Sequence, residues 1–204
     1  MPGKHVRIDE RQNEYFSPRP EIVAIPSRHH SSTSSGSSSH HGSSHHSSLR
    51  PVGIHRLLSA ASPALIQVDL RQSAHHYIPT ISSTFLARPA TEPPLPRLTL
   101  VSSHLPWRVH VDASNGRAVT VQDVLAALSH TLRAPVTEAE FHTLLGHSDR
   151  RRAAAAYTER YRRAGTPEEK RAGLRRVDFL MSRYHFAGLE AVRGHGDVWA
   201  LCVR

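Results

Sequence analysis

The stretch RAVTVQDVLAALSHTLR, residues 117–133, decides how the rest of the chain is organised. Its apolar side chains recur at the spacing of an α-helix, 3.6 residues per turn, so they form one stripe. The stripe consists of Val121, Val124, Leu125, Leu128 and Leu132. The segment therefore predicts an amphipathic helix that packs against a hydrophobic core.

Residues just before this stripe predict where the helix begins. Thr120 stands at the N-cap position, and Asp123 adds a negative charge to the first turn, where the helix dipole favours it. The preceding Ser114-Asn115-Gly116 is a turn signal. We therefore expect a strand to end, the chain to reverse and the helix to follow.

Alternating apolar and polar residues predict strands on both sides of the helix. Upstream, Trp107–Val111 and the second half of residues 65–70 have this pattern, and Leu98–Val101 is a further expected strand. Downstream, Leu189–Arg193 and Val198–Val203 are separated by Gly-His-Gly-Asp and are typical of a β-hairpin. These strands predict one small, mostly antiparallel sheet.

The last of these strands is apolar on both faces. This pattern predicts a covered, central position in the sheet. Cys202, the single cysteine of the chain, lies in this strand, so we expect an unreactive core thiol rather than a nucleophile.

Further helices are expected after the central one. The capping box Thr137-Glu138-Ala139-Glu140 predicts a helix with Phe141, Leu144 and Leu145 on its inner side. Residues 150–164 predict a third helix, and residues 173–184 have apolar side chains at helical spacing and predict a fourth. The chain is therefore expected to have an α+β fold, a single compact domain in which three or four helices pack on the sheet.

We place this globular domain at residues 51–204 and a disordered Ser/His-rich tail at residues 1–50. Residues 27–48 contain no aliphatic or aromatic side chain, so they cannot bury enough surface to offset the entropy of ordering. The histidine pairs in this segment could take up a metal ion, but a structural zinc site needs four ligands held by an ordered frame. A solvated linker is the preferred interpretation.

Composition limits the class of protein. The formal net charge of +9 favours acidic partners, and the single cysteine excludes an intramolecular disulfide. The charged N-terminus does not resemble a secretory signal, and no window has the roughly 20 apolar residues of a membrane span. We expect no membrane association and a cytoplasmic or nuclear location.

Five short strings occur in an order and spacing that resemble a known family. They are Asp69-Leu70, Ala90-Thr91-Glu92-Pro93-Pro94, Val119–Leu125, Arg176–Leu180 and Phe186–Leu189. Together they resemble an uncharacterised domain-of-unknown-function family of mushroom-forming (basidiomycete) fungi, over roughly residues 55–203. The resemblance implies a single fungal intracellular domain and brings no catalytic residue or ligand with it.

The chain lacks the motifs of common enzyme classes. No nucleophile elbow, phosphate-binding loop, dinucleotide fingerprint or zinc-protease helix is present. Asp178 stands among apolar residues, where a buried ion pair with Arg176 or Arg160 is the preferred interpretation. We expect no catalytic residue, no cofactor and no metal, and an unrecognised hydrolase is only the third alternative.

Charge is the most informative functional feature. Residues 150–183 carry eleven basic and four acidic side chains, which is nearly all of the positive excess. In the helix expected there, Arg151, Arg152, Arg162 and Arg163 project away from the packed tyrosines. These four arginines predict a basic face that binds an acidic protein surface or phosphate groups.

The sequence thus predicts a non-enzymatic protein-interaction domain with a basic face. The alternative is sequence-nonspecific nucleic-acid binding through residues 150–183, although that face has no aromatic side chain to stack bases. A proline-rich loop that includes Pro93 and Pro94 is a second possible interaction site. The sequence leaves the oligomeric state open.

Overall fold

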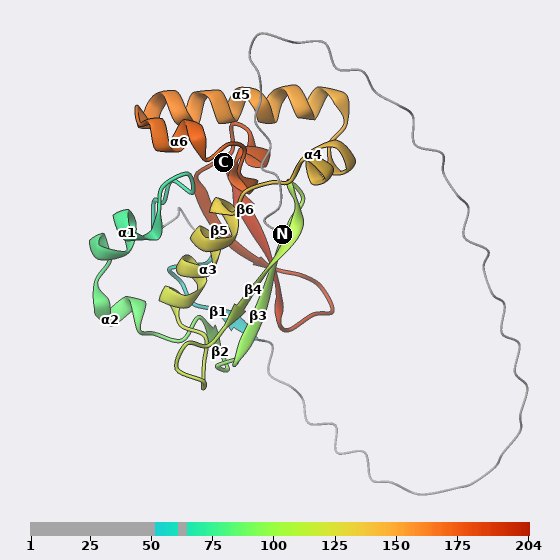
Figure 1. The fold of residues 1–204 in the computed structure, drawn as a ribbon. Coiled ribbons are helices and arrows are strands. Elements are labelled where there is room, and N and C mark those ends of the chain that lie inside the picture. The colour runs from blue at the N-terminus through green and yellow to red at the C-terminus, as the bar shows by residue number, and fades with distance from the viewer. Residues whose placement is uncertain (1–51, 61–64) are drawn as a thin grey trace, which may run out of the picture. The chain divides into compact units, whose positions relative to one another are not determined.

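The computed structural model describes residues 52–60 and 65–204, which belong to one compact unit. Its centre is a four-stranded sheet with the order β4-β3-β6-β5 (Figure 1). β3 pairs antiparallel with β4 and parallel with β6, and β6 pairs antiparallel with β5. The strands are β3 (Arg97–Ser102), β4 (Leu105–Asp112), β5 (Phe186–Ala191) and β6 (Val198–Val203). The predicted α+β fold is confirmed, whereas the predicted tail at residues 1–50 lies outside the described residues.

A second, smaller sheet pairs β1 (Gly53–Ile54) with β2 (Thr91–Glu92) in antiparallel orientation. Between these strands the chain forms three short helical turns, α1 (Ala74–Tyr77), η1 (Ile78–Thr80) and α2 (Ser83–Leu86). The longer helical elements follow β4. They are α3 (Val121–Arg133), α4 (Glu138–Leu144), α5 (His147–Ala164), α6 (Pro167–Arg171) and the 3-10 helix η2 (Arg176–Leu180).

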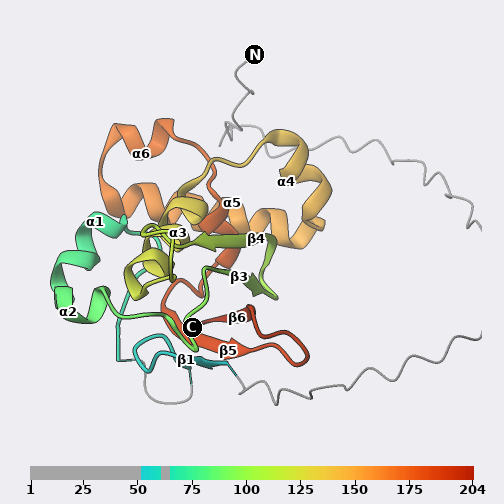
Figure 2. The same cartoon turned by 90° about the horizontal axis from the view of Figure 1, so that it is seen from below.

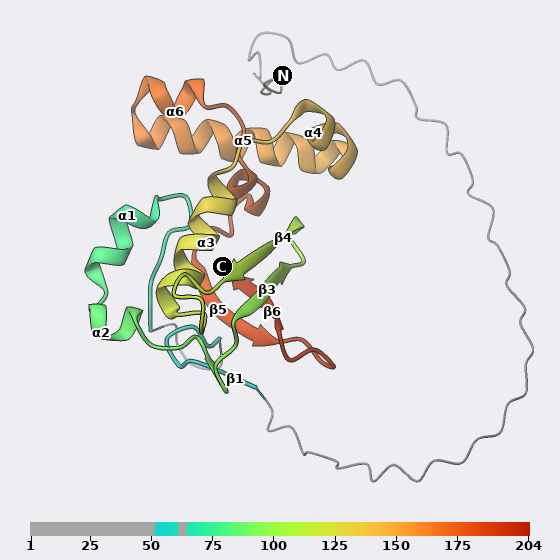
Figure 3. The same ribbon diagram turned by 60° about the horizontal axis from the view of Figure 1, so that its bottom comes forward.

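The helices pack in layers on one side of the sheet (Figures 2 and 3). α3 lies between the sheet and the short helices α1 and α2. Two hydrogen bonds attach α1 to α3: the Tyr77 hydroxyl donates to the Leu125 carbonyl at 3.1 Å, and the Ala74 amide donates to the Ser129 hydroxyl at 2.9 Å. α5 and α6 lie side by side near the C-terminal end of α3, with η2 packed beneath α5 (Figure 1).

The predicted central helix is confirmed in its phase and in its cap. All five residues of the apolar stripe are fully buried. The Thr120 hydroxyl accepts a hydrogen bond from the Asp123 amide at 3.1 Å, and the Asp123 carboxylate accepts one from the Thr120 amide at 2.9 Å. This reciprocal pair satisfies two amide groups that the first turn of a helix leaves without partners, which fixes the start of α3.

The capping box at Thr137 and Glu140 is also confirmed, and it opens α4 as predicted. Phe141 is buried, but Leu144 is 41% exposed, so its predicted inward position was wrong. α4 ends at Leu144, and this last residue does not reach the core. The Glu140 carboxylate also accepts a hydrogen bond from the Trp107 indole at 2.9 Å, which connects α4 to β4.

The continuous helix predicted for residues 173–184 is wrong. Only η2 is helical there, and Met181 leaves the helical region with a φ of 57°. A 3-10 helix has three residues per turn, so an apolar stripe read at 3.6 residues per turn does not describe it. Val177 on that predicted stripe and Phe179 off it are both buried.

Residues 65–70 alternate as predicted but do not form a strand. Ile66, Val68 and Leu70 are buried and Leu65 is exposed, and the segment makes only the single bridge between Asp69 and His185 among the described residues. The alternation of apolar and polar residues in this segment therefore arises because one side of an extended chain is buried, without strand pairing. A strand would also need a continuous partner for its backbone groups.

β6 occupies the predicted central position, between β3 and β5. Trp199 and Leu201 are buried on one face, whereas Cys202 on the other face is half-buried, so the predicted core thiol was placed too deep. Burial, with the nearby charge of Glu190, nevertheless raises the pKa of the Cys202 thiol. The thiolate, which is the reactive form, is therefore disfavoured.

Gly188 in β5 fills a position that no other residue fits. Its φ is 119°, and a β-carbon at this site would lie 2.5 Å from the Ala60 backbone nitrogen. The close approach allows backbone hydrogen bonds on both sides of the contact, from Leu189 to the Leu58 carbonyl at 2.6 Å and from Ala60 to the Leu189 carbonyl at 3.2 Å. The segment before residue 61 is thereby attached to the edge of the sheet.

Candidate functional site

Charged side chains converge where α3, α5 and α6 meet. α3 ends at Arg133, and α5 ends at Ala164 with Gly165 as a left-handed C-cap. Thr166 then caps α6, as its side chain accepts a hydrogen bond from the Glu169 amide. This tight return directs the Glu169 side chain towards arginines of three other segments.

Arg160 and Asp178 form a buried ion pair beneath this junction. Two Arg160 nitrogens donate to the two Asp178 oxygens at 2.8 and 2.9 Å, and the side chains are 4% and 2% exposed. The Asp178 carboxylate also accepts a hydrogen bond from the Arg175 amide at 2.8 Å. The predicted buried pair is confirmed with Arg160, the second of its two candidate partners.

Glu169 is shared by three arginines. Its carboxylate contacts Arg133 at 3.2 Å and Arg175 at 2.8 Å, and it also accepts a hydrogen bond from Arg160. Burial acts to raise the pKa of Glu169, but the positive charges of the three arginines outweigh it and hold the pKa below its ordinary value. The carboxylate is therefore ionised and offsets only part of the surrounding positive charge.

Arg71 forms a second ion pair on the other side of the junction. Its guanidinium donates three hydrogen bonds to the Asp69 carboxylate, the shortest at 2.7 Å, and one to Glu159 of α5 at 3.1 Å. Its guanidinium stacks on the Tyr184 ring at 3.3 Å from the ring centre. Glu159 thus pairs with Arg71 and does not form the helical pair with Arg163 that their spacing allows.

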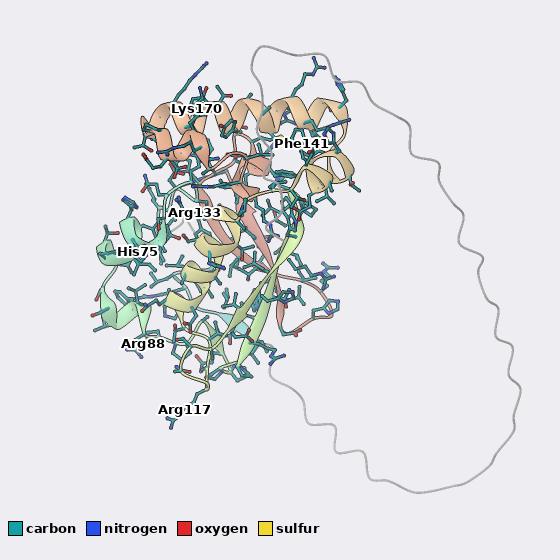
Figure 4. The ribbon with its side chains drawn as sticks, viewed as in Figure 1. His75, Arg88, Arg117, Arg133, Phe141 and Lys170 are labelled. Carbon is teal, nitrogen blue, oxygen red and sulfur yellow. The ribbon has the colours of Figure 1, made fainter. Side chains whose placement is uncertain are left out.

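These groups surround an open groove of about 460 Å³, which we call the arginine groove. Figure 4 shows Arg133 between α1 and the α5–α6 pair, which form the two sides of the groove. Its charged lining consists of Arg71, Arg133, Arg160, Arg163, Asp69 and Glu169. Its polar lining includes Gln72, Ser73, His76 and Thr166. Four arginines against two carboxylates make this groove a candidate site for an anion.

The four arginines of the predicted basic face are all exposed on α5. They lie in two pairs, Arg151 with Arg152 near one end of the helix and Arg162 with Arg163 near the other. Eleven residues separate corresponding members, so the pairs share one side of the helix at about 16 Å spacing, by a rise of 1.5 Å per residue. Only Arg163 also lines the arginine groove.

The basic residues of the segment 150–183 fall into two groups, those held by contacts within the fold and those free on the surface. Arg160 and Arg175 are held in the ion-pair network, and Arg171 pairs with Glu168. Arg176 packs over the Trp107 ring at 4.7 Å, and Arg152 contacts Asp149 at 3.5 Å. Arg151, Arg162 and Arg163 form no ion pair with any residue that the structure describes.

Pro93 and Pro94 are exposed, as the predicted loop requires, but they lie apart from the arginine groove. Pro94 lines a different groove of about 710 Å³ together with Arg56, Phe85 and Arg88. The preceding residues Ala90 and Thr91 are buried, and Thr91 belongs to β2. This segment is therefore partly a structural strand, with only its proline end available to a partner.

Sequence reasoning missed most of the arginine groove. Arg71, Arg133 and Glu169 come from separate segments, and no local pattern connects them. One weak signal was present, since Thr166 and Glu169 have the spacing of a capping box. In the structure the Glu169 carboxylate turns towards the arginines, which leaves only half of that box in place.

No cluster of three histidine, cysteine, aspartate or glutamate side chains within residues 52–60 and 65–204 is arranged to hold a metal ion. In the same part of the chain, no helix combines the length and the apolar character needed to cross a membrane.

The pH dependence of stability tests the ion pairs that Glu169 forms with its three arginines. Because its pKa in the folded chain is lowered, ionised Glu169 stabilises the fold above its unfolded pKa, and this contribution is lost as the pH falls through the folded pKa. We expect Glu169→Gln to be less stable than the wild type at pH 7, by a difference that shrinks below about pH 4.5. Urea unfolding of both proteins from pH 7 to pH 3 measures this difference. A difference in stability that does not depend on pH would show that the ionised Glu169 carboxylate does not stabilise the fold.

Comparison with known proteins identifies the family of the chain. The model of a family of unknown function, DUF6699, matches residues 29–197. The match begins within the Ser/His-rich segment that the sequence resemblance left out, and it ends just before β6. Neither the curated proteins nor the solved structures contain a match. The chain belongs to this DUF6699 family of unknown function.

Proposed function

We propose that this chain is a non-enzymatic protein-interaction domain that binds an acidic protein surface through the basic face of α5. The observation that supports the proposal is the pairing of the arginines on this helix. The basic face carries four exposed arginines, of which only Arg152 contacts a carboxylate among the described residues. Ordinary surface helices balance such charges with neighbouring acidic side chains.

The packing of α5 makes its arginines available to a partner. Ala153 and Tyr157 are buried on the opposite side of the helix, and Arg160 anchors it to Asp178. The exposed arginines therefore contribute little to holding α5 in place. A partner with carboxylates spaced by about 16 Å could contact both arginine pairs at once.

Charge reversal tests this function. Replacing Arg151, Arg152, Arg162 and Arg163 by glutamate should weaken partner binding at least about tenfold, because four attractive contacts of about 0.2–1 kcal/mol each become repulsive. The matched control reverses four exposed arginines outside α5, Arg108, Arg117, Arg193 and Arg204. Copurification from cells, followed by titration of the recovered partner, measures the effect.

Both variants change the net charge equally, so a difference between them depends on position. Retention of the partner by the control and its loss by the α5 variant would support the proposal. Equal retention by both variants would refute it and would shift attention to the groove beside Pro94. Circular dichroism of both variants checks that the fold persists.

Sequence-nonspecific nucleic-acid binding is the second candidate, since the same four arginines could contact phosphates. In that case log affinity should fall against log salt with a slope of roughly −3 to −4 for four neutralised phosphates, and nuclease should release the partner. The exposed side of α5 has no aromatic residue, because Tyr157 and Tyr161 pack inward against each other at 5.1 Å. This absence of a stacking surface favours the acidic protein partner.

A further inference from the structure

The arginine groove contains hydrogen-bond donors that the protein itself does not use. Arg71 and Arg160 direct their guanidinium groups to Asp69 and Asp178, so they contribute charge and few free donors. The Arg163 side chain makes no hydrogen bond or ion pair with any other residue in the described part of the chain. A guanidinium carries five N–H donors, so Arg163 brings a complete set to the rim of the groove.

Arg133 also has unused capacity. Its two contacts, to the Arg71 carbonyl at 3.3 Å and to Glu169 at 3.2 Å, are long for charge-assisted hydrogen bonds, which are typically about 2.7–2.9 Å. Ser73 lines the groove as well, and its hydroxyl does not cap α1. Donors from three segments therefore face the same space.

The charge of the groove is not balanced by its own carboxylates. The four arginines of the lining face Asp69 and Glu169, and two further carboxylates, Glu159 and Asp178, pair with Arg71 and Arg160. With Arg175, which also pairs with Glu169, five arginines stand against four carboxylates, a formal excess of one positive charge with His76 neutral. Burial, together with the charges of Arg133 and Arg160, lowers the pKa of Arg175, as expected where like charges converge.

The unused donors of Arg163 and Arg133, more than the net charge, distinguish between possible anions. A carboxylate and a backbone phosphodiester each carry a single negative charge. A phosphate monoester carries about −1.5 to −2 at pH 7 and presents three acceptor oxygens. Arginine forks suit this group because they donate two parallel hydrogen bonds to neighbouring phosphate oxygens.

We propose that the arginine groove binds a phosphate monoester, the phosphorylated serine or threonine side chain of a protein partner, with Arg163 and Arg133 as its direct ligands. Arg71 and Arg160 supply the positive field from fixed ion pairs, and the Ser73 hydroxyl donates to a phosphate oxygen. The assignment to a protein partner rests on the proposed function. Phosphorylation of the partner would then strengthen its binding, because the phosphate adds a contact in the arginine groove to the contact between the basic face and the acidic surface.

Binding of a short phosphopeptide to the full chain tests the proposal. The probe is acetyl-Gly-Gly-phosphoserine-Gly-Gly-amide, compared with the same peptide carrying glutamate in place of phosphoserine, and titrations are followed by NMR. The phosphopeptide should bind the wild type about tenfold more tightly than the glutamate peptide, because it brings a second charge and a third acceptor oxygen. Equal affinity for the two peptides would overturn the proposal.

Two neighbouring arginines of α5 provide a matched pair of variants. Arg163→Glu should lose the phosphopeptide by about tenfold or more, whereas Arg162→Glu, exposed but outside the groove lining, should change its affinity less than about twofold. Both positions are exposed, so neither change disturbs the core. Equal losses in the two variants would show a diffuse charge effect and overturn the site.

Inorganic phosphate as a third probe separates the possible sources of the anion. It should compete with the phosphopeptide but bind more weakly, because it lacks the peptide contacts. If inorganic phosphate binds as tightly as the phosphopeptide, the assignment to a protein side chain is wrong.

The variant Arg151→Glu/Arg152→Glu, at the distant end of α5, should keep phosphopeptide binding and lose affinity for the acidic partner. If this variant binds both the phosphopeptide and the acidic partner as the wild type does, only the proposed function is refuted, and the phosphate site stands.

Discussion

Arg160→Ala is expected to lower the free energy of unfolding by about 3–5 kcal/mol, because it leaves the Asp178 carboxylate buried without its counter-charge. Asp178 is 2% exposed, and Arg160 supplies two of its hydrogen bonds. The same change removes the donor to the Gly173 carbonyl and one of the three arginines on Glu169. Urea unfolding of the variant and the wild type at pH 7 measures the loss.

Two controls isolate the buried charge. Arg162→Ala removes an exposed arginine two residues away and should change stability by less than about 0.5 kcal/mol. The double variant Arg160→Met/Asp178→Leu removes both charges and should be more stable than Arg160→Ala, because no buried charge is left unpaired. Equal losses from Arg160→Ala and Arg162→Ala would mean that the ion pair does not hold α5 to η2.

Leu128→Ala is expected to cost about 2–5 kcal/mol, since it opens a cavity in the middle of the α3 stripe. Leu128 is fully buried on α3, the helix that lies between the sheet and the helices α1 and α2. His130→Ala, on the exposed side of the same helix, should be nearly silent. Denaturant midpoints of the two variants measure the contrast. Equal effects would show that the packed face of α3 is misidentified.

The elements that sequence predicted well are those that local chemistry determines. α3 has five apolar residues in helical phase and a reciprocal cap between Thr120 and Asp123, so its boundaries follow from adjacent residues. The same holds for the hairpin of β5 and β6, where two apolar runs flank a turn that contains glycines. In these places propensity, pattern and tertiary packing agree.

The wrong predictions arose where tertiary contacts decide the backbone. Residues 173–184 have apolar residues at helical spacing, yet η2 is only a short 3-10 helix. Its backbone is pinned at both ends, by the hydrogen bond from Arg176 to the Ala134 carbonyl and by the turn at Met181. Neither constraint is local to the pattern, so periodicity alone could not reveal them.

Part of the candidate site could likewise be predicted from local sequence, and part could not. Exposed arginines on α5 followed from helical phase, because residues opposite the buried Tyr157 face solvent. The arginine groove did not, since Arg71 and Arg133 reach it from segments that the fold brings together. A charge count along the chain finds an excess of basic residues but cannot separate buried ion pairs from free donors.

The strings that carry the family resemblance have structural roles. Val119–Leu125 contains the cap of α3, and Arg176–Leu180 contains the buried Asp178. Phe186–Leu189 contains Gly188, which has no room for a side chain, and Asp69 pairs with Arg71 beside the arginine groove. The resemblance therefore identified the framework of the domain, and the basic face of α5 lies outside these strings.

The central claim, that the basic face of α5 is the working surface, is tested most directly by mapping the contact on the chain. NMR spectra of the ¹⁵N-labelled protein, titrated with the acidic partner recovered by copurification, report on each arginine side chain through its Nε–Hε signal. The account predicts that the signals of Arg151, Arg152, Arg162 and Arg163 shift together while those of Arg108 and Arg117 stay unchanged. Shifts confined to residues around Pro93 and Pro94, with the α5 arginines unaffected, would contradict it.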